Sequence, residues 1–180
     1  MLKTIRPEAM TDNIFKLIGK DTALLTACNA EYIPDGQIKY GRTNSMTVSW
    51  GSFGQLWNKN VYTIYVRPSR YTKEILDETD TFTLSFLDVN KYKNALTYMG
   101  QHSGRDGDKY RPAKVSVSYQ NGMAYIKEAR LVMFCRKIYA QEFNPDCFTN
   151  ELVCKSNYKK DDFHTMYIAE IEKIIEDIRK

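Results

Sequence analysis

The pattern of hydrophobic and polar positions along the chain predicts strands more often than helices. Residues 22–30 form an apolar run without charge, which is typical of a buried strand. In residues 44–51 and 81–87, apolar side chains alternate with Ser and Thr, which predicts strands with two different faces. Residues 61–66 are β-branched and aromatic, and residues 129–143 contain a second long apolar run. These patterns together indicate a protein built mainly from β-strands.

Glycine, asparagine and proline mark the turns between these segments. An Asn-Gly pair at 121–122 separates two short strand-like runs and predicts a β-hairpin over residues 114–126. Pro34 to Gly36 indicates another turn. We expect Gly41 to break the chain a second time, before the strand at 44–51 begins.

Helical patterns are short by comparison. Residues 71–78 and 91–99 mix apolar and charged positions as helices do, and we expect Gly100 to end the second one. The run at 164–172 is ambiguous, because its alternation suits a strand while its isoleucines also form a helical stripe. The isoleucines of that stripe are Ile168, Ile171, Ile175 and Ile178.

The order of these elements favours an antiparallel barrel. About six or seven predicted strands, with two inserted helices and no regular βαβ alternation, are typical of that architecture. The 180 residues contain no repeat or low-complexity linker, so we expect a single domain over residues 1–180. The 13 tyrosines and 8 phenylalanines suit sheet faces, a ring-binding pocket or a subunit interface.

Charge and cysteine content narrow the classes of function. A net charge of +4 is too small to indicate nucleic-acid binding. Charged residues interrupt the N-terminal apolar positions, and no segment reaches the ~18 apolar residues of a membrane span. The four cysteines form no CxxC pair and there are two histidines, so we expect reduced thiols and no metal site. The expected protein is cytoplasmic and binds neither nucleic acid nor membranes.

The familiar catalytic and nucleotide-binding motifs do not occur in the sequence. It contains no GxGxxG, GxxxxGK[ST], GxSxG or HExxH motif, which leaves polar clusters near the ends of predicted strands. In the first cluster, residues 44–54, a Ser- and Thr-rich strand leads to Trp50. Its backbone groups, hydroxyls and aromatic ring suit a flat heteroaromatic ligand. The alternative is an edge strand with one face in solvent.

The second cluster, Arg67 to Thr72, precedes a predicted helix. Two guanidinium groups, hydroxyls and free N–H groups at the start of a helix suit a phosphate. The alternative is an ordinary strand-to-helix turn, in which Ser69 caps the helix and both arginines are solvated.

The remaining candidates are a loop and one histidine. Arg105 and Lys109, in the glycine-broken loop at 102–109, are candidate anion partners, and the alternative is an exposed connection. His164 begins the last apolar run. A lone histidine there is either structural or, with an unperturbed pKa near ~6.5, a hydrogen-bonding group beside a ligand.

In their order along the chain, these clusters resemble the flavin reductase-like, FMN-binding split-barrel family. The segments that carry the resemblance are N-S-M-T-V-S-W, R-P-S-R-Y-T, F-T-L-S-F, S-G-R-D-G-D-K and H-T-M-Y-I-A-E-I, over roughly residues 15–175. The resemblance implies a mainly β fold, a six-stranded Greek-key antiparallel split barrel with short inserted helices. It also implies a homodimer with FMN at the subunit interface, and it favours a strand at 164–172.

The resemblance assigns roles to residues as well. The strand from Met46 to Trp50 would contact the isoalloxazine ring, mostly through its backbone. The second cluster would hold the phosphate of FMN, and the loop from Ser103 to Lys109 would close over the site. His164 matches a position near the flavin or the nicotinamide and is the expected catalytic residue. The expected cofactor-binding residues are Asn44, Ser45, Met46, Thr47, Val48, Ser49, Trp50, Arg67, Ser69, Arg70, Thr72, Ser103, Gly104, Arg105 and Lys109.

The function that the resemblance implies is electron transfer through FMN. The flavin would take a hydride from NADH or NADPH, while the protein binds and orients it. Residues 31–42 and 144–163 follow the family pattern only loosely and are expected to shape access to the flavin. One alternative is a flavoredoxin-type electron carrier that receives electrons from a partner protein without a nicotinamide site. Others are a ligand-binding module without activity and a pyridoxamine-phosphate oxidase, whose pattern these clusters match less well.

Overall fold

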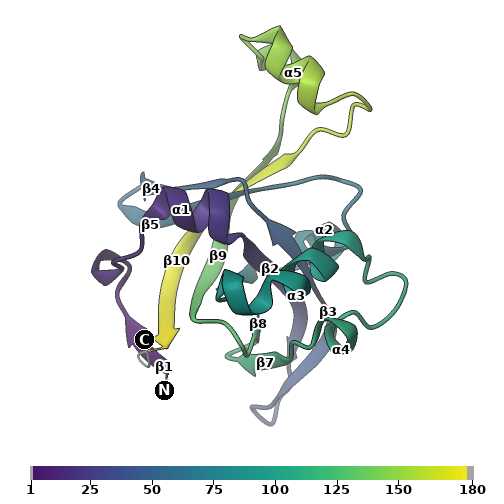
Figure 1. Cartoon of the computed structure of the whole chain (residues 1–180). Helices are drawn as coiled ribbons and strands as arrows, with labels where there is room; N and C mark the ends of the chain where they lie inside the picture. Colours follow the sequence, from purple (N-terminus) through teal and green to yellow (C-terminus); the bar gives the residue numbers. More distant parts are fainter. Residues whose placement is uncertain (1, 178–180) are drawn as a thin grey trace.

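Antiparallel strands dominate the structure, a computed structural model that describes residues 2–177 (Figure 1). Within this range, one sheet contains the strands in the order β3-β2-β6-β9-β10-β5-β4, with β1 paired to β10, and β7 and β8 form a separate hairpin. The strands are β1 (Leu2–Ile5), β2 (Ala23–Tyr32), β3 (Ile38–Val48), β4 (Gly51–Leu56), β5 (Lys59–Val66), β6 (Thr81–Phe86), β7 (Val117–Gln120), β8 (Met123–Ile126), β9 (Leu131–Glu142) and β10 (Thr165–Asp177). The mainly β composition and the hairpin at 114–126 are therefore confirmed.

The helices are short and lie between the strands. They are α1 (Ile14–Lys16), which continues into a π-helical turn (Leu17–Asp21), α2 (Tyr71–Asp77), α3 (Val89–Gln101), α4 (Tyr110–Ala113) and α5 (Glu151–Asn157), with 3-10 turns at Pro7–Ala9 and Pro145–Cys147. In the described part of the chain, no helix has the length and apolar character needed to cross a membrane. No group of three or more His, Cys, Asp or Glu residues in that part could hold a metal ion.

The long strand β10 joins the two halves of the sheet. It pairs with β9 along one edge and with β5 and β1 along the other. Register shifts after Ile168 and Ile171 interrupt the β9–β10 ladder, and such irregularities bend a strand and increase its twist. The helical interpretation is wrong for Ile168, Ile171 and Ile175, which lie in this strand, and Ile178 lies outside the described residues. The strand that the family resemblance favoured is confirmed, and it extends to Asp177.

The sheet curls so that its distant strands share one core. Met46 and Val48 of β3 belong to the same buried cluster as Ile64 and Val66 of β5, although these strands are not paired. A closed core of this kind removes apolar surface from water without a second sheet. The groove described below lies at this junction.

The strands β2, β6 and β9 are buried on both faces. Leu25 and Met133 face the inner cluster, whereas Leu24, Val132 and Phe134 pack in a second cluster with side chains of α3 and β8. Burial on both faces explains why residues 22–30 carry no charged or alternating pattern.

The polar positions of β6 are buried too. The Thr83 hydroxyl donates to the carbonyl of Ala124 at 2.6 Å, and Ser85 Oγ accepts from the N–H of Ile126 at 3.1 Å. These hydroxyls attach the β7–β8 hairpin to the outer face of the sheet, so the alternation in residues 81–87 does not mark a solvent-exposed face.

Two glycines act differently from the sequence-based expectation. Strand β3 begins at Ile38 and continues through Gly41, although its ladder with β2 has a register shift there, between the pairs Cys28–Thr43 and Ala30–Tyr40. Helix α3 continues through Gly100 to Gln101. A Cβ at position 100 would lie 2.6 Å from Thr47 Oγ1, so this glycine allows α3 to approach β3 closely rather than ending the helix.

One segment projects from the barrel. Residues 143–163, between β9 and β10, form an arm that carries α5 and extends away from the sheet (Figure 1). The N-terminus lies on the opposite side of the molecule, where β1 pairs with the end of β10 (Figure 1). Helices α2 and α3 both contact β3, and together they border the groove that contains the candidate site.

Candidate functional site

Two adjoining cavities form a groove along β3. The first, of about 150 Å³, lies between β3, the start of α2 and the loop after α3. The second, of about 190 Å³, lies between the end of β3, β5 and the start of β10. Met46 and Arg70 line both cavities. Apart from Ser45, every residue that the sequence singled out as catalytic or cofactor-binding lines one cavity or the other.

Ser45 lies on the other face of β3 and not in the groove. It is fully buried, and its Oγ lies 2.8 Å from Thr26 Oγ1 and 3.1 Å from the Tyr110 hydroxyl. Successive side chains of a strand point to opposite faces, so a strand cannot present all its residues to one ligand. Ser45 could contribute to a ligand only through its backbone.

Lys109 is a buried cation at one end of the groove. Its side chain is 4% exposed, and Nζ donates to the carbonyls of Met99 and His102 at 3.3 and 3.2 Å. Within residues 2–177 it forms no ion pair with a carboxylate. Burial, reinforced by the charge of Arg70, lowers the pKa of Lys109 to about 8. A buried ammonium without a counter-ion is costly, and an anion in the adjoining cavity would offset that cost.

Arg70 supplies a second cation without a partner. Its guanidinium makes no hydrogen bond or ion pair to the described residues, whereas Arg67 and Arg105 each bind a carboxylate. Arg70 lies at the point where the two cavities meet, so its charge is available to either one. Because α2 has only seven residues, we base the anion site on these two side chains and not on the end of the helix.

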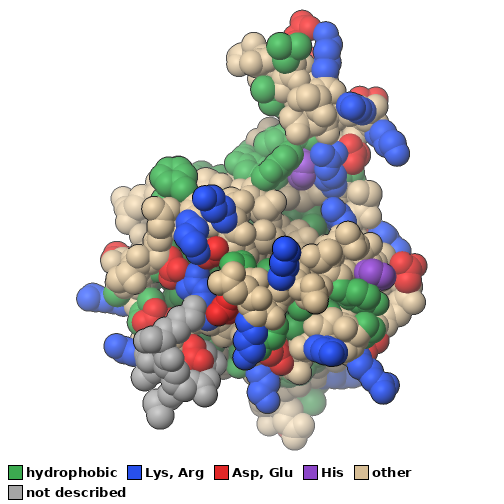
Figure 2. Space-filling model, viewed as in Figure 1, with side chains coloured by type: hydrophobic (Ala, Val, Ile, Leu, Met, Phe, Trp, Pro, Cys, Tyr) green, Lys and Arg blue, Asp and Glu red, His purple; other side chains and the backbone are tan. Residues whose placement is uncertain are grey.

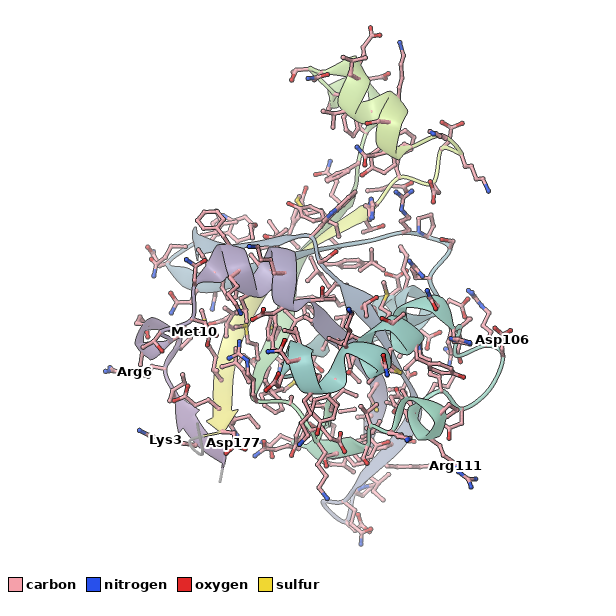
Figure 3. The ribbon with its side chains drawn as sticks, viewed as in Figure 1. Lys3, Arg6, Met10, Asp106, Arg111 and Asp177 are labelled. Atoms are coloured by element: carbon pink, nitrogen blue, oxygen red, sulfur yellow. The ribbon has the colours of Figure 1, made fainter. Side chains whose placement is uncertain are left out.

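The loop after α3 is tied across β3 and α2. Arg105 pairs with Glu74, donates to the carbonyl of Ser69 at 3.2 Å and lies over the Tyr71 ring at 5.3 Å. Arg105 therefore fastens the loop instead of presenting a free charge. Asp106, labelled in Figure 3, lies next to it on the outer side of this loop.

Gly104 allows this loop to pack closely against β3. A Cβ at position 104 would lie 2.2 Å from Asn44 Oδ1, and Asn44 Nδ2 donates to Thr72 Oγ1 at 2.8 Å. Asn44 and Thr72 are both buried. Strand β3, helix α2 and the loop after α3 therefore meet at the Asn44–Thr72 hydrogen bond, beside the first cavity.

Aromatic side chains line the other end of the groove. The ring of Trp50, which is 49% exposed, lies 5.2 Å from the ring of His164. Tyr65 also lines this cavity. The sequence analysis missed Tyr65, because an aromatic residue in a predicted strand is ordinary. This end of the groove suits a planar ring.

His164 is buried and neutral at pH 7. Burial, followed by the charge of Arg67, lowers the pKa of His164 to about 4. Its Nδ1 lies 2.8 Å from the Tyr158 hydroxyl. Burial raises the pKa of Tyr158, so its hydroxyl is protonated and can donate to Nδ1, which leaves the ring proton on Nε2.

Arg67 is occupied by residues of the arm. Its Nη1 pairs with Asp162 at 2.6 Å, its Nη2 donates to the carbonyl of Asn157 at 2.9 Å, and its guanidinium lies 5.3 Å from the centre of the Tyr158 ring. The sequence-based expectation placed Arg67 at a phosphate. In the structure Arg67 lines the ring end of the groove, and Arg70 and Lys109 are the cations of the groove that have no carboxylate partner among residues 2–177.

Fold and groove together describe an antiparallel barrel with a slot for a planar ligand that carries an anionic end. Residues 17–179 match the model of the flavin reductase like domain, and the chain therefore belongs to that family. No curated protein sequence matches the chain.

Solved structures share this fold at low sequence identity. An FMN-binding domain of a flavin reductases-like enzyme from Shewanella baltica OS155 is 14% identical, with a TM-score of 0.66 over 98% of this chain and 78% of that one. A flavoredoxin from Methanosarcina acetivorans is 21% identical, with a TM-score of 0.62 over 95% and 77%. The flavoredoxin of Desulfovibrio vulgaris (Miyazaki F) is 18% identical, with a TM-score of 0.63 over 97% and 76%. The expected mainly β split barrel with short helices is confirmed.

Proposed function

We propose that the groove binds FMN and that the protein passes electrons from NADH or NADPH through this flavin. The observation that carries the proposal is the pair of cations, Arg70 and Lys109, that lack carboxylate partners beside a cavity continuous with an aromatic slot. A phosphate fits the first feature and an isoalloxazine ring the second. Membership of the flavin reductase-like family supports the same ligand.

Each part of the groove has a distinct task in this proposal. Arg70 and Lys109 hold the phosphate, and the loop fastened by Arg105 closes that end. The end of β3, from Met46 to Trp50, borders the ring. A bound FMN supplies the hydride and electron chemistry, so the protein needs no nucleophile and no metal.

His164 contributes as a neutral ring. With a pKa of about 4 it carries no positive charge at pH 7, so it is not a general acid in the imidazolium form. It donates or accepts a hydrogen bond at the wall of the ring slot. We propose His164 as the catalytic residue only in the sense that its neutral ring forms a hydrogen bond beside the flavin.

Nicotinamide-dependent reduction distinguishes the reductase from the electron carrier. We expect the purified protein to bind FMN, and anaerobic NADH or NADPH to bleach the band of bound FMN faster than that of free FMN. The measurement is stopped-flow absorbance with each donor separately. Bleaching no faster than that of free FMN would leave the second candidate, a flavoredoxin-type carrier reduced by a partner protein. The similarity to two flavoredoxin structures favours this as the alternative.

The charge of Lys109 makes FMN binding depend on pH. The ammonium form attracts the phosphate, and with a pKa of about 8 this form is lost as the pH rises through that value. We expect the affinity for FMN to be constant near pH 7 and to fall above pH ~8, approaching about tenfold per pH unit. Fluorescence titration at several pH values would check this. Riboflavin, which has no phosphate, is the control ligand, and a parallel fall in its affinity would contradict the assignment.

Exposed apolar side chains bear on the quaternary structure. Large apolar side chains are exposed outside the groove, among them Phe15 at 82%, Leu152 at 77% and Trp57 at 58%. Figure 2 shows hydrophobic side chains gathered where the arm leaves the barrel. Exposed apolar surface of this kind marks an interaction site, and we propose that a second copy of the chain covers it in a homodimer. We also propose a single domain and a cytoplasmic location.

A further inference from the structure

One arginine, Arg67, links the arm to the barrel through its side chain. Arg67, the residue directly after β5, binds both ends of the turn that leads back from α5 to β10. Its guanidinium donates to the carbonyl of Asn157 at 2.9 Å and pairs with the Asp162 carboxylate at 2.6 Å. The side chains of Arg67 and Asp162 are 26% and 29% exposed, so solvent screens this ion pair only in part. Because the guanidinium is planar and rigid, binding the Asn157 carbonyl and the Asp162 carboxylate at once fixes the geometry of the turn between these two residues.

The turn that Arg67 holds contains the hydrogen-bond partner of His164. Tyr158 lies beneath the Arg67 guanidinium, and its hydroxyl lies 2.8 Å from His164 Nδ1. The Tyr158 ring stacks on Phe163 at 4.7 Å and meets the edge of Phe148 at 5.7 Å. The phenol is therefore fixed from several sides, with its hydroxyl at the imidazole.

The imidazole in turn forms part of the wall of the ring slot. His164 lies 5.2 Å from Trp50, and its carbonyl accepts from the N–H of Phe143 at 2.9 Å. Its backbone is held by this bond at the base of the arm, whereas the only hydrogen bond to its ring within residues 2–177 is that of Tyr158. A contiguous path thus leads from Arg67 through Tyr158 to His164.

We propose that Arg67 is a positioning residue that sets the orientation and tautomer of His164 by holding the Tyr158 turn. This inference rests on the proposed function, because His164 matters only if a flavin occupies the slot. Arg67 has no role at the phosphate in this assignment. Its donors are taken by Asp162 and Asn157, and it does not line the cavity that contains Lys109.

The test uses the full chain labelled with ¹⁵N-histidine. The two histidines give two sets of ring signals. The variant His102→Gln removes one set, so the set that remains belongs to His164. We expect the wild-type His164 ring to show one tautomer, with the proton on Nε2, from pH 5 to pH 8. Arg67→Met should produce a mixture of tautomers and raise the pKa of His164 from about 4 toward 6.5. Arg67→Lys, which keeps the charge and can keep the pair with Asp162, should restore part of the wild-type signal.

A matched control removes an ion pair elsewhere on the arm. Glu151→Gln breaks the exposed pair between Glu151 and Lys155 within α5 and should leave the His164 signals unchanged. Tyr158→Phe keeps the ring but removes the hydroxyl, and it should reproduce the tautomer mixture of Arg67→Met. Unchanged His164 signals in Arg67→Met, in a protein whose other resonances show that it is folded, would overturn the proposal.

A second readout separates this role from phosphate binding. Arg67→Met should weaken binding of riboflavin and FMN by the same factor, because the lost positioning acts at the ring. If FMN binding alone is weakened, Arg67 holds the phosphate and the proposal is wrong. The NMR signals need no flavin, so failure of the protein to bind any flavin would refute the proposed function while the tautomer measurement still decides the role of Arg67.

Discussion

The double variant Arg70→Ala/Lys109→Met should bind FMN roughly 10²- to 10⁴-fold more weakly than the wild type, because two charge-assisted hydrogen bonds of ~1.5–3 kcal/mol each are lost and 1.4 kcal/mol corresponds to tenfold. Both cations lack a carboxylate partner in the described chain and line the same cavity. Binding of riboflavin should change little, since it carries no phosphate. Fluorescence titration with both flavins measures the two affinities under the same conditions.

The same substitutions should not destabilise the protein without flavin. Lys109 is buried with carbonyl acceptors alone, so methionine removes the cost of burying its charge. We expect the ligand-free variant to unfold at a higher temperature than the wild type. The control Lys93→Met/Arg111→Met removes two exposed charges from α3 and α4, and Arg111 is labelled in Figure 3. Equal losses of FMN affinity in both double variants would show that net charge, and not this cavity, holds the phosphate.

Replacing Gly104 by alanine should disrupt the phosphate end of the groove while leaving the barrel folded. The new Cβ would lie 2.2 Å from Asn44 Oδ1 and 2.8 Å from Asn44 Cγ. Asn44 is buried and bonded to Thr72, so it cannot retreat without breaking that bond. Overpacking of this kind costs about 1–3 kcal/mol, and if the loop moves to relieve it, FMN binding should weaken about 5- to 150-fold. Titration with FMN would check this.

Gly54 provides the comparison for this substitution. It lies in β4 with nothing within 4 Å of an added Cβ, so Gly54→Ala should leave both stability and FMN affinity close to those of the wild type. Far-ultraviolet circular dichroism should show the same β content for both variants. Wild-type FMN affinity in Gly104→Ala would mean that the loop does not need its close contact with Asn44.

The strands were predictable where their pattern reflects their own burial. The uncharged run at 22–30 became β2, and the apolar run within 129–143 became β9, because both are covered on two faces. The turn at 121–122 was predictable from local chemistry, since Asn121 and Gly122 both have positive φ angles of 51° and 79°. An apolar run and a turn pair such as Asn-Gly are both properties of residues that are neighbours in the sequence.

Glycines were misread where their role depends on a distant element. Gly100 looked like a helix end, yet α3 continues one residue further to Gln101, and the missing side chain at position 100 leaves room for Thr47 of β3. Local sequence cannot show which strand will lie against a helix. The same limitation applies to β10, whose isoleucines suited two structures until pairing with β9 and β5 decided between them.

The sequence by itself determined the mainly β architecture and the set of polar segments that form the groove, because alternation and charge are local properties. Every candidate that it indicated except Ser45 lines the groove, although it missed Tyr65. Tertiary structure alone decided their roles. It buried Lys109 and left Arg70 without a partner, but it brought Asp162 and Asn157 to Arg67 across some 90 residues of chain. Burial and long-range pairing set the charge state and freedom of a side chain, and both depend on neighbours that lie far away in the sequence.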